Sequence, residues 1–219
     1  MQNLDVSKSI IDHCLLMNDS GLNQGTSGNI SVRQGANMLI TPSALAYELM
    51  KPEDIVLMPI NDNFDLSRLK RKPSSEWRFH AAILAARPEV NAIVHTHSPY
   101  ATSLAMVRKS IPACHYMIAV FGGNDVRCSD YAIVGSPALA ETALDALKDR
   151  FGCLLANHGM IALGETLEKA MWRAAELETL ARQYCIALSV GEPALLNETE
   201  MEEMHALMSS YGLQSTSEE

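Results

Sequence analysis

Two histidines with one residue between them, His95 and His97, follow the apolar run 92–94, and a third histidine, His158, follows a second apolar run much later in the chain. Side chains on a β-strand repeat every second residue, so His95 and His97 are expected to leave the same face. Three imidazoles are the usual ligands of a catalytic zinc ion that keeps a fourth position open. The alternative is surface or satisfied core histidines, but the third histidine in a similar setting favours a metal site.

Glu76 is close in sequence to the first two histidines, and it is expected in the first turn of a helix. Its carboxylate is a candidate fourth ligand or a general base beside the metal. The alternative is an acidic residue that interacts favourably with the helix dipole. The pattern alone leaves both interpretations open.

Three short clusters of hydroxyl-bearing residues and glycines are candidate anion sites. Ser74 and Ser75 precede the helix of Glu76, where unpaired backbone N–H groups point outward, and either serine is expected to cap that helix. The glycine-containing loop 25–29 allows close approach of the backbone to a phosphate, and residues 41–43 form the third cluster. Each cluster alone is compatible with a simple turn, whereas together they suggest a phosphorylated substrate.

A metal ion beside a carboxylate and a phosphate pocket suits one type of chemistry. The metal polarises a carbonyl group and stabilises the enolate that forms next to it, while the carboxylate moves the proton. Aldol cleavage, dehydration and epimerisation of keto-sugar phosphates all use this chemistry.

The elements that must position these residues alternate between helices and strands. The pattern predicts an α/β fold with a mostly antiparallel central sheet flanked by helices, because hairpin signals are interspersed with helical periodicity. Strands are expected at 29–33, 38–41 and 55–60 and at the two histidine segments, and helices at 4–20, 76–86, from Ser136-Pro137 onward, 167–190 and 198–209.

The composition indicates one globular domain over residues 1–219, because the chain has no linker or repeat and 47% of its residues are hydrophobic. A net charge of −9 argues against nucleic acid or an anionic membrane as partner. Five cysteines without a C-x-x-C pair, and the absence of a signal-peptide pattern, predict a cytoplasmic protein. No apolar stretch approaches the roughly 20 residues of a membrane span.

Seven segments of the chain together resemble the class II sugar-phosphate aldolase family, which has the aldolase/adducin fold, and most closely its L-fuculose-1-phosphate aldolases. The match covers nearly the whole chain in order, with similar spacings. The segments that carry it are 21–33, 39–43, 73–80, 94–98, 111–119, 157–159 and 211–213.

The resemblance implies a three-layer α/β/α fold and a zinc enzyme that acts as a homotetramer, with active sites between neighbouring subunits. Zinc, for which cobalt or manganese can substitute, would bind His95, His97 and His158, with Glu76 as a resting fourth ligand that swings off to serve as base. Tyr116 of the adjacent subunit would protonate the oxygen of the leaving aldehyde, and Tyr211, in a loosely ordered tail at about 210–219, would close over the site. The phosphate would be held by Gly28, Asn29, Ser43, Ala44, Ser74 and Ser75.

The activity that the resemblance implies is reversible retro-aldol cleavage of a 2-ketose 1-phosphate to dihydroxyacetone phosphate and a short aldehyde. Two positions depart from the family pattern: Ala44 replaces a common glycine, and Val134 replaces a phenylalanine of the aldehyde wall. Because valine is smaller than phenylalanine, 5-deoxy- and 5-methylthio-pentulose 1-phosphates are candidate substrates as well as L-fuculose 1-phosphate.

Three alternatives remain. A methylthioribulose-1-phosphate dehydratase would use the same metal and release water. A ribulose-phosphate 4-epimerase shares the scaffold but carries aspartate at the position of Glu76. A non-enzymatic, adducin-like module would lack the histidines, all three of which this chain retains.

Overall fold

One β-sheet forms the centre of the protein. The structure is a computed structural model that describes residues 2–61 and 64–208, and in these residues the strand order is β3-β2-β1-β4-β8-β7-β6-β5. The strands are β1 (Asn29–Gln34), β2 (Asn37–Ile40), β3 (Val56–Pro59), β4 (Ala92–Thr96), β5 (Ile111–Pro112), β6 (Asp125–Cys128), β7 (Gly152–Leu155) and β8 (Gly159–Gly164). The α-helices are α1 (Gln2–Asp19), α2 (Trp77–Ala86), α3 (Pro99–Met106), α4 (Pro137–Ala146), α5 (Leu167–Val190) and α6 (Glu198–Met208).

The sheet is mixed, although most of its pairs are antiparallel as predicted. Strands β6 and β7 pair in parallel, while the other neighbouring strands run antiparallel. A parallel pair needs a crossover connection, and α4 supplies it between β6 and β7. A description of the sheet as purely antiparallel would therefore be wrong for strands β6 and β7.

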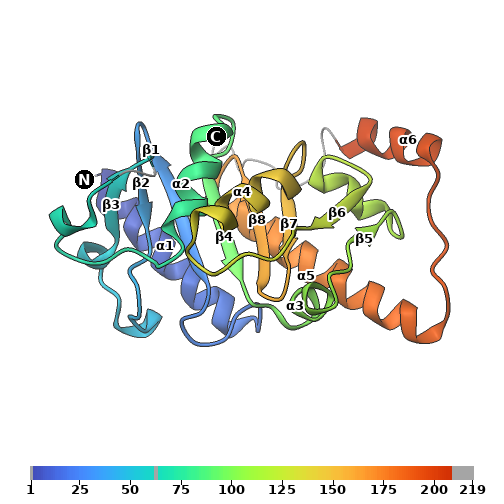
Figure 1. Ribbon diagram of the computed structural model, residues 1–219, viewed down its shortest axis with the longest axis horizontal. Coiled ribbons are helices and arrows are strands. Elements are labelled where there is room, and N and C mark those ends of the chain that lie inside the picture. The colour runs from blue at the N-terminus through green and yellow to red at the C-terminus, as the bar shows by residue number, and fades with distance from the viewer. Residues whose placement is uncertain (1, 62–63, 209–219) are drawn as a thin grey trace, which may run out of the picture.

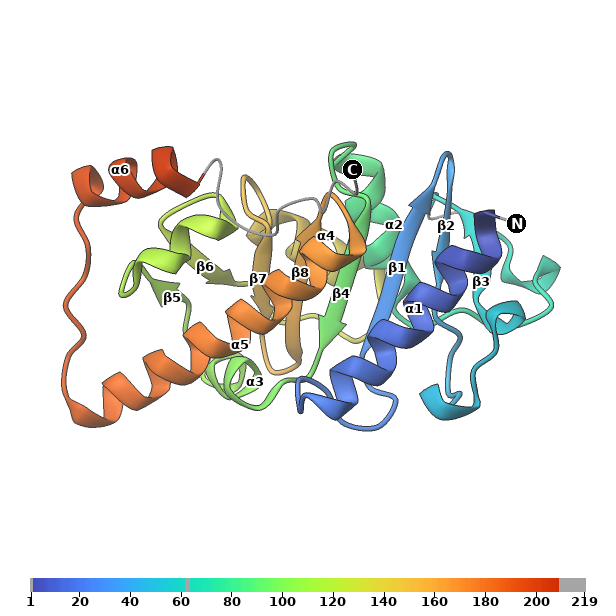
Figure 2. The same ribbon diagram turned by 180° about the vertical axis from the view of Figure 1, so that it is seen from behind.

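Helices cover both faces of the sheet, so the predicted three-layer α/β/α arrangement is confirmed. Figure 1 shows α2 and α4 in front of the central strands, and Figure 2 shows α1 and α5 behind them. Neighbouring residues of β4 point to opposite layers, as strand geometry requires: Val94 packs with the core under α1, α3 and α5, and Ile93 with the core under α2 and α4. Short 3₁₀ helices lie in the connections: η1 (Tyr47–Leu49), η2 (Pro52–Asp54), η3 (Leu66–Arg68) and η4 (Tyr116–Phe121).

The predicted helices are present, but the start of α2 differs from the prediction. Ser136 caps α4 as expected, because its Oγ accepts a hydrogen bond from Leu139 N at 3.1 Å. At α2 neither serine caps the helix: Glu76 is the N-cap residue, and Ser74 Oγ accepts a hydrogen bond from the backbone N–H of Glu76 at 3.3 Å. Glu76 thus lies one position before the helix rather than in its first turn. The predicted end of the last helix, at residue 209, lies outside the described residues.

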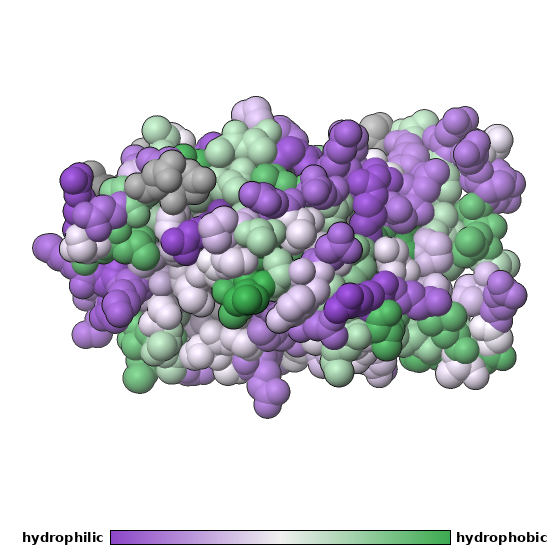
Figure 3. Space-filling view, in the orientation of Figure 1, coloured by the Kyte–Doolittle hydropathy of each residue, from purple (hydrophilic) through white to green (hydrophobic). Residues whose placement is uncertain are grey.

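Polar side chains dominate the outer surface of the helical layer in front of the sheet, where Figure 3 shows only small separate hydrophobic patches. Over the stretches 2–61 and 64–208, no helix has the combination of length and apolar character that a bilayer span requires.

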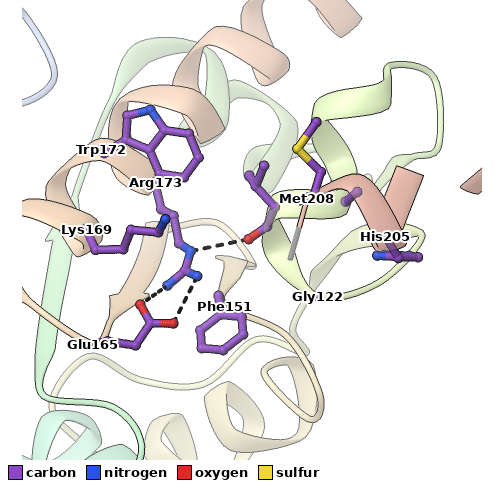
Figure 4. Close-up of a pocket in the computed structure, with 10 residues that line it drawn as sticks. Gly122, Phe151, Glu165, Lys169, Trp172, Arg173, His205 and Met208 are labelled. Atoms are coloured by element: carbon purple, nitrogen blue, oxygen red, sulfur yellow. Dashed lines mark hydrogen bonds and ion pairs between the residues drawn. The ribbon is translucent and has the colours of Figure 1, made fainter. Parts of the chain in front are cut away.

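A buried arginine ties α5 to the sheet and to η4. Arg173 is 5% exposed, and its guanidinium donates hydrogen bonds to Val120 O at 3.2 Å, to Leu163 O at 2.9 Å and to the carboxylate of Glu165. It lies at the wall of a cavity of about 300 Å³ and over the ring of Phe151 (Figure 4). Because its donors are directed at protein acceptors, Arg173 has a structural role.

We expect Arg173→Met to lower the free energy of unfolding by about 3 kcal/mol, because it leaves two buried carbonyl groups and a carboxylate without their partner. The matched change Glu165→Gln should cost less than about 1 kcal/mol, since the Glu165 side chain is 48% exposed. Urea unfolding followed by circular dichroism measures both. Equal costs for the two variants would contradict the structural role of Arg173.

Candidate active site

The three predicted histidines meet where β4 ends and β8 begins. His95 is in β4, His97 follows it, and His158 is in the turn between β7 and β8. Strands β4 and β8 are antiparallel neighbours, so Thr96 pairs with Met160 and the two chain segments that carry histidines adjoin. The ring centroids are 4.9–5.0 Å apart, and one ring nitrogen of each histidine lies within 4.8 Å of the others.

A glycine permits this close approach. A Cβ on Gly159 would lie 2.5 Å from Thr96 O and 2.8 Å from His97 Cδ2, so any side chain would push the histidines apart. Asn157 holds the same turn in a left-handed conformation with φ of +56°, which asparagine tolerates better than most residues. Its side chain amide bonds to Met106 O and accepts from Arg108, which fixes the turn against the end of α3.

Glu76 lies against the histidines with both of its carboxylate oxygens. Its Oε2 is 3.1 Å from His95 Nε2, and its Oε1 is 3.2 Å from His158 Nε2. Oε2 also accepts a hydrogen bond from Asn29 Nδ2 at 2.9 Å. Glu76 is 4% exposed, so the carboxylate and the imidazoles interact with little screening by water.

The protonation of the cluster follows from burial and from these neighbours. Burial alone raises the pKa of Glu76, but His95 and His158 outweigh burial and hold that pKa well below its usual range. Burial, together with the neighbouring His95 and His158, lowers the pKa of His97 to about 4. Burial also lowers the pKa of His95, yet Glu76 and the carbonyl of Met160 outweigh it, so this pKa is raised. Binding of a metal at neutral pH would therefore displace a proton from the cluster.

The donor atoms fit a divalent metal ion. His95 Nδ1 donates a hydrogen bond to Met160 O at 2.9 Å, which leaves the lone pair of Nε2 directed at the cluster. His97 Nε2 is buried and has no hydrogen-bond partner, and the buried Glu76 Oε1 has only the imidazole of His158 close by among the described residues. Buried polar atoms are nearly always satisfied, so such atoms facing one another indicate a ligand between them. Imidazole nitrogens with a carboxylate oxygen form a donor set typical of zinc.

The three hydroxyl and glycine clusters adjoin one another. Ser43 N donates to Lys72 O at 3.0 Å and Ser74 N donates to Thr41 O at 2.9 Å, so residues 41–44 lie beside Ser74 and Ser75. Thr41 N also donates to Ile30 O at 3.1 Å, which brings Gly28 and Asn29 alongside. The predicted phosphate-binding residues thus lie together next to Glu76, with Ser43, Ala44 and Ser75 exposed.

The backbone at Ala44 and at Gly28 restricts which residues fit at these two positions. Ala44 has φ of +56°, the left-handed conformation in which glycine is unstrained and which costs an alanine about 1 kcal/mol. Gly28 has no such φ, but a Cβ there would lie 2.8 Å from His95 O, so only glycine fits.

Asn29 and His80 have contacts that sequence reasoning missed. The side chain of Asn29, predicted as a phosphate ligand, bonds to Glu76 and lies 2.5 Å from His80 Nε2. His80 is fully buried beside Ser31. Sequence spacing places Asn29 and Ser31 on one face of a strand and Glu76 and His80 one helical turn apart, but it does not show that the two pairs meet.

The segment around Val134 lies beside Ser75. A Cβ on Gly135 would lie 2.6 Å from Ser75 O, and Arg78 Nη1 donates to Gly135 O at 3.1 Å. Val134 itself is 59% exposed, so its side chain is available to a ligand near the serine turn.

Tyr116 lies far from the histidines of its own chain. It is in η4 directly after β5, and β5 is four strand positions from β4 in the sheet. At about 4.8 Å per strand this separation is roughly 19 Å, beyond the reach of a tyrosine side chain. The side chain is 44% exposed and its ring stacks on His115. The other predicted tyrosine, Tyr211, lies outside the described residues.

Comparisons with known proteins agree with this architecture. Residues 8–185 match the family described as Class II Aldolase and Adducin N-terminal domain. The chain is 48% identical over 203 residues to a 5-methylthioribulose-1-phosphate/5-deoxyribulose-1-phosphate aldolase of Rhodospirillum rubrum, covering 93% of this chain and 90% of that protein. It is 45% identical over 214 residues to an L-fuculose phosphate aldolase of Haemophilus influenzae, covering 97% and 98%.

A solved structure of an L-fuculose 1-phosphate aldolase superposes with a TM-score of 0.88 at 40% sequence identity, covering 94% of this chain and 96% of that one. The protein therefore belongs to the class II aldolase and adducin family, and the fold expected from the resemblance is confirmed. Class II aldolases are metal dependent, and the three histidines form a site that a metal can occupy.

We expect Gly159→Ala to weaken zinc binding at least about tenfold, because the new methyl group displaces the ring of His97 and the backbone beside His95. Competition with a chromophoric chelator measures the affinity. Gly191→Ala is the matched control, since a Cβ at Gly191 meets no atom within 4 Å. Unchanged zinc affinity in a folded Gly159→Ala protein would contradict the proposed ligand set.

Proposed function

We propose that this protein catalyses reversible retro-aldol cleavage of a 2-ketose 1-phosphate to dihydroxyacetone phosphate and a short aldehyde. The observation that carries the proposal is the buried carboxylate of Glu76, which lies between the histidine cluster and the Ser74–Ser75 turn. Family membership and aldolase relatives at 45–48% identity support the same reaction.

The proposed metal ligands are His95, His97 and His158, with Glu76 as a fourth ligand before substrate binds. When bound, the metal, for which zinc suits imidazole ligands best, supplies the Lewis acidity that draws electrons from the C2 carbonyl of the substrate. The burial of His95 and Glu76 excludes water from this side of the substrate.

Glu76 is the proposed base and acid at C3. In the cleavage direction the C4 hydroxyl gives its proton to a base and the C3–C4 bond breaks with its electron pair remaining on C3. Glu76, after taking up a proton, delivers it to that carbon, so the number of protons is unchanged overall. In the condensation direction the same carboxylate removes the proton. The neighbouring histidines hold the pKa of Glu76 well below its usual range, so at neutral pH the carboxylate is ionised and able to take up a proton.

The proposed phosphate site is the junction of the three clusters, formed by Gly28, Asn29, Ser43, Ala44, Ser74 and Ser75. Hydroxyl groups and backbone N–H groups at turns bind phosphate without a full positive charge. Since Asn29 already holds Glu76 with its side chain, we assign its contribution to the phosphate to its remaining N–H groups.

For the aldehyde end we propose a wall that includes Val134. Its exposed side chain lies next to Gly135, which contacts Ser75, and valine leaves more room than the phenylalanine that the resemblance gives to the fuculose enzyme at this position. We therefore favour a 5-deoxy- or 5-methylthio-pentulose 1-phosphate over L-fuculose 1-phosphate, in keeping with the relative from Rhodospirillum rubrum.

The decisive test is a coupled assay for dihydroxyacetone phosphate with the 1-phosphates of L-fuculose, L-rhamnulose, 5-deoxyribulose and 5-methylthioribulose. We expect cleavage with a preference for one of the last two. Glu76→Gln should bind zinc but lose about 10²–10⁴ in kcat, because the amide cannot exchange the proton.

Two outcomes would contradict the proposal. Full activity in the Glu76→Gln enzyme would remove Glu76 from the proton transfer. Loss of water from 5-methylthioribulose 1-phosphate without any triose phosphate would instead establish a dehydratase.

We also propose a homotetramer in which Tyr116 of one subunit completes the site of its neighbour. Tyr116 would give a proton to the aldehyde oxygen during condensation and take it back during cleavage. Two observations support the shared site: the roughly 19 Å between β5 and β4, and the exposure of a tyrosine that has no role in its own core.

Subunit mixing tests this arrangement. Glu76→Gln and Tyr116→Phe proteins, each nearly inactive, should regain activity when they are co-expressed as hybrids, because about one quarter of the sites then combine an intact Glu76 with an intact Tyr116. Hybrids of Glu76→Gln with His158→Ala are the control, since both changes affect the same chain's cluster and no intact site can form. Absence of recovery in purified mixed tetramers would contradict a site shared between subunits.

A further inference from the structure

We propose that His80 and Ser31 are positioning residues that, through Asn29, hold Oε2 of Glu76 and leave Oε1 for the metal and the proton. The proposal rests on the proposed function of Glu76 for its kinetic consequences. The line of hydrogen bonds from Ser31 through His80 and Asn29 to Glu76, which we call the relay, rests on the described contacts alone.

The four side chains form a continuous line of short contacts. Ser31 Oγ is 2.7 Å from His80 Nδ1, and His80 Nε2 is 2.5 Å from Asn29 Oδ1. Asn29 Nδ2 is 2.9 Å from Glu76 Oε2. Strand β1 supplies Asn29 and Ser31, which lie two residues apart. Glu76 lies at the start of α2, and His80 lies one turn along that helix.

The direction of each hydrogen bond follows from the carboxylate. An ionised carboxylate only accepts, so Asn29 must turn its Nδ2–H group to Glu76 and its Oδ1 to His80. His80 must then donate from Nε2. A neutral His80 accepts at Nδ1 from the hydroxyl of Ser31, and burial favours this neutral form, lowering the pKa of His80 to about 3. Every donor in the relay therefore points toward Glu76.

Burial makes the relay rigid and strong. Ser31, His80, Asn29 and Glu76 are all buried, so water does not compete for these donors and acceptors. Hydrogen bonds in series polarise one another in a low-dielectric interior, which strengthens the contact at the carboxylate end. The ring of Phe79 stacks on His80 at 4.4 Å and packs edge-on against His95, which holds the plane of the imidazole.

The relay makes the two carboxylate oxygens unequal. Oε2 accepts from Asn29, while Oε1 is buried and lies 3.2 Å from Nε2 of His158, itself a proposed metal ligand. A carboxylate fixed at one oxygen pivots about that oxygen, so Oε1 is the atom that can ligate a metal, leave it and exchange a proton. Loss of the relay would let both oxygens move and would reduce the fraction of enzyme with Oε1 in place.

Three variants and one control test the relay. His80→Leu removes the donor to Asn29, His80→Gln keeps an N–H donor at similar reach, and Ser31→Ala removes the hydroxyl that fixes the tautomer. We expect His80→Leu to lower kcat about 10- to 100-fold with KM nearly unchanged, and to weaken zinc binding about tenfold in a chelator competition. His80→Gln should recover most of both. His13→Gln, on α1, where the ring contacts Ser9 O at 2.8 Å, is the control and should match the wild type.

A spectroscopic readout is independent of activity. In ¹⁵N spectra of the zinc-loaded protein, His80 should show a protonated Nε2 and an unprotonated Nδ1, and Ser31→Ala should shift Nδ1 most. This measurement also applies if His80→Leu does not fold. If the wild type cleaves no ketose phosphate, the proposed function fails, while the zinc and ¹⁵N readouts still test the relay. An Nδ1-protonated His80, or a His80→Gln protein as impaired as His80→Leu, would overturn it.

Discussion

A single buried carboxylate constrains the rest of this molecule. Glu76 lies within 3.2 Å of two imidazoles and is almost fully removed from water. A buried charge of this kind is stable only if its neighbours compensate it, so the histidines, Asn29 and the helix start must all be in place together. The arrangement that stabilises the charge also creates the donor set for a divalent metal. The same contacts therefore stabilise the buried charge of Glu76 and form the proposed metal site.

The scaffold supplies this geometry through one pair of antiparallel strands and two tight turns. Strand β4 delivers His95 and His97 at its end, and the β7–β8 turn delivers His158 beside them. Gly159 allows the contact because a side chain there would collide with the backbone of Thr96. Glu178 anchors the segment after His97, since its carboxylate accepts from the backbone N–H groups of Tyr100 and Ala101 at the start of α3. The histidines are thus held by core elements rather than by free loops, which limits their motion.

The serine and glycine turns meet at the same edge as Glu76, so the proposed phosphate and carbonyl ends of a substrate lie within reach of each other. The exposed Val134 segment also lies beside Ser75. Tyr116 is separated from its own cluster by the width of several strands. A complete site in the proposed mechanism therefore depends on association of subunits, and folding of one chain is not sufficient for it.

The sequence by itself determined every α-helix of the described residues except α3, the hairpin and the identity of the clustered histidines, because these depend on local periodicity and on residue types with few alternative uses. The spacing of His95 and His97 predicts a shared face, and Ser136-Pro137 predicts the start of α4. The predicted serine cap of α2 is wrong, since a serine near a helix start has several backbone partners within reach, and Ser74 bonds to Glu76 N instead of capping the helix. Only the tertiary structure decided that β6 and β7 pair in parallel, and that His80, Ser31 and Asn29 form one line toward Glu76. Those contacts join β1 to α2 across more than forty residues, and hydrogen bonds between distant segments leave no period in the sequence from which they can be inferred.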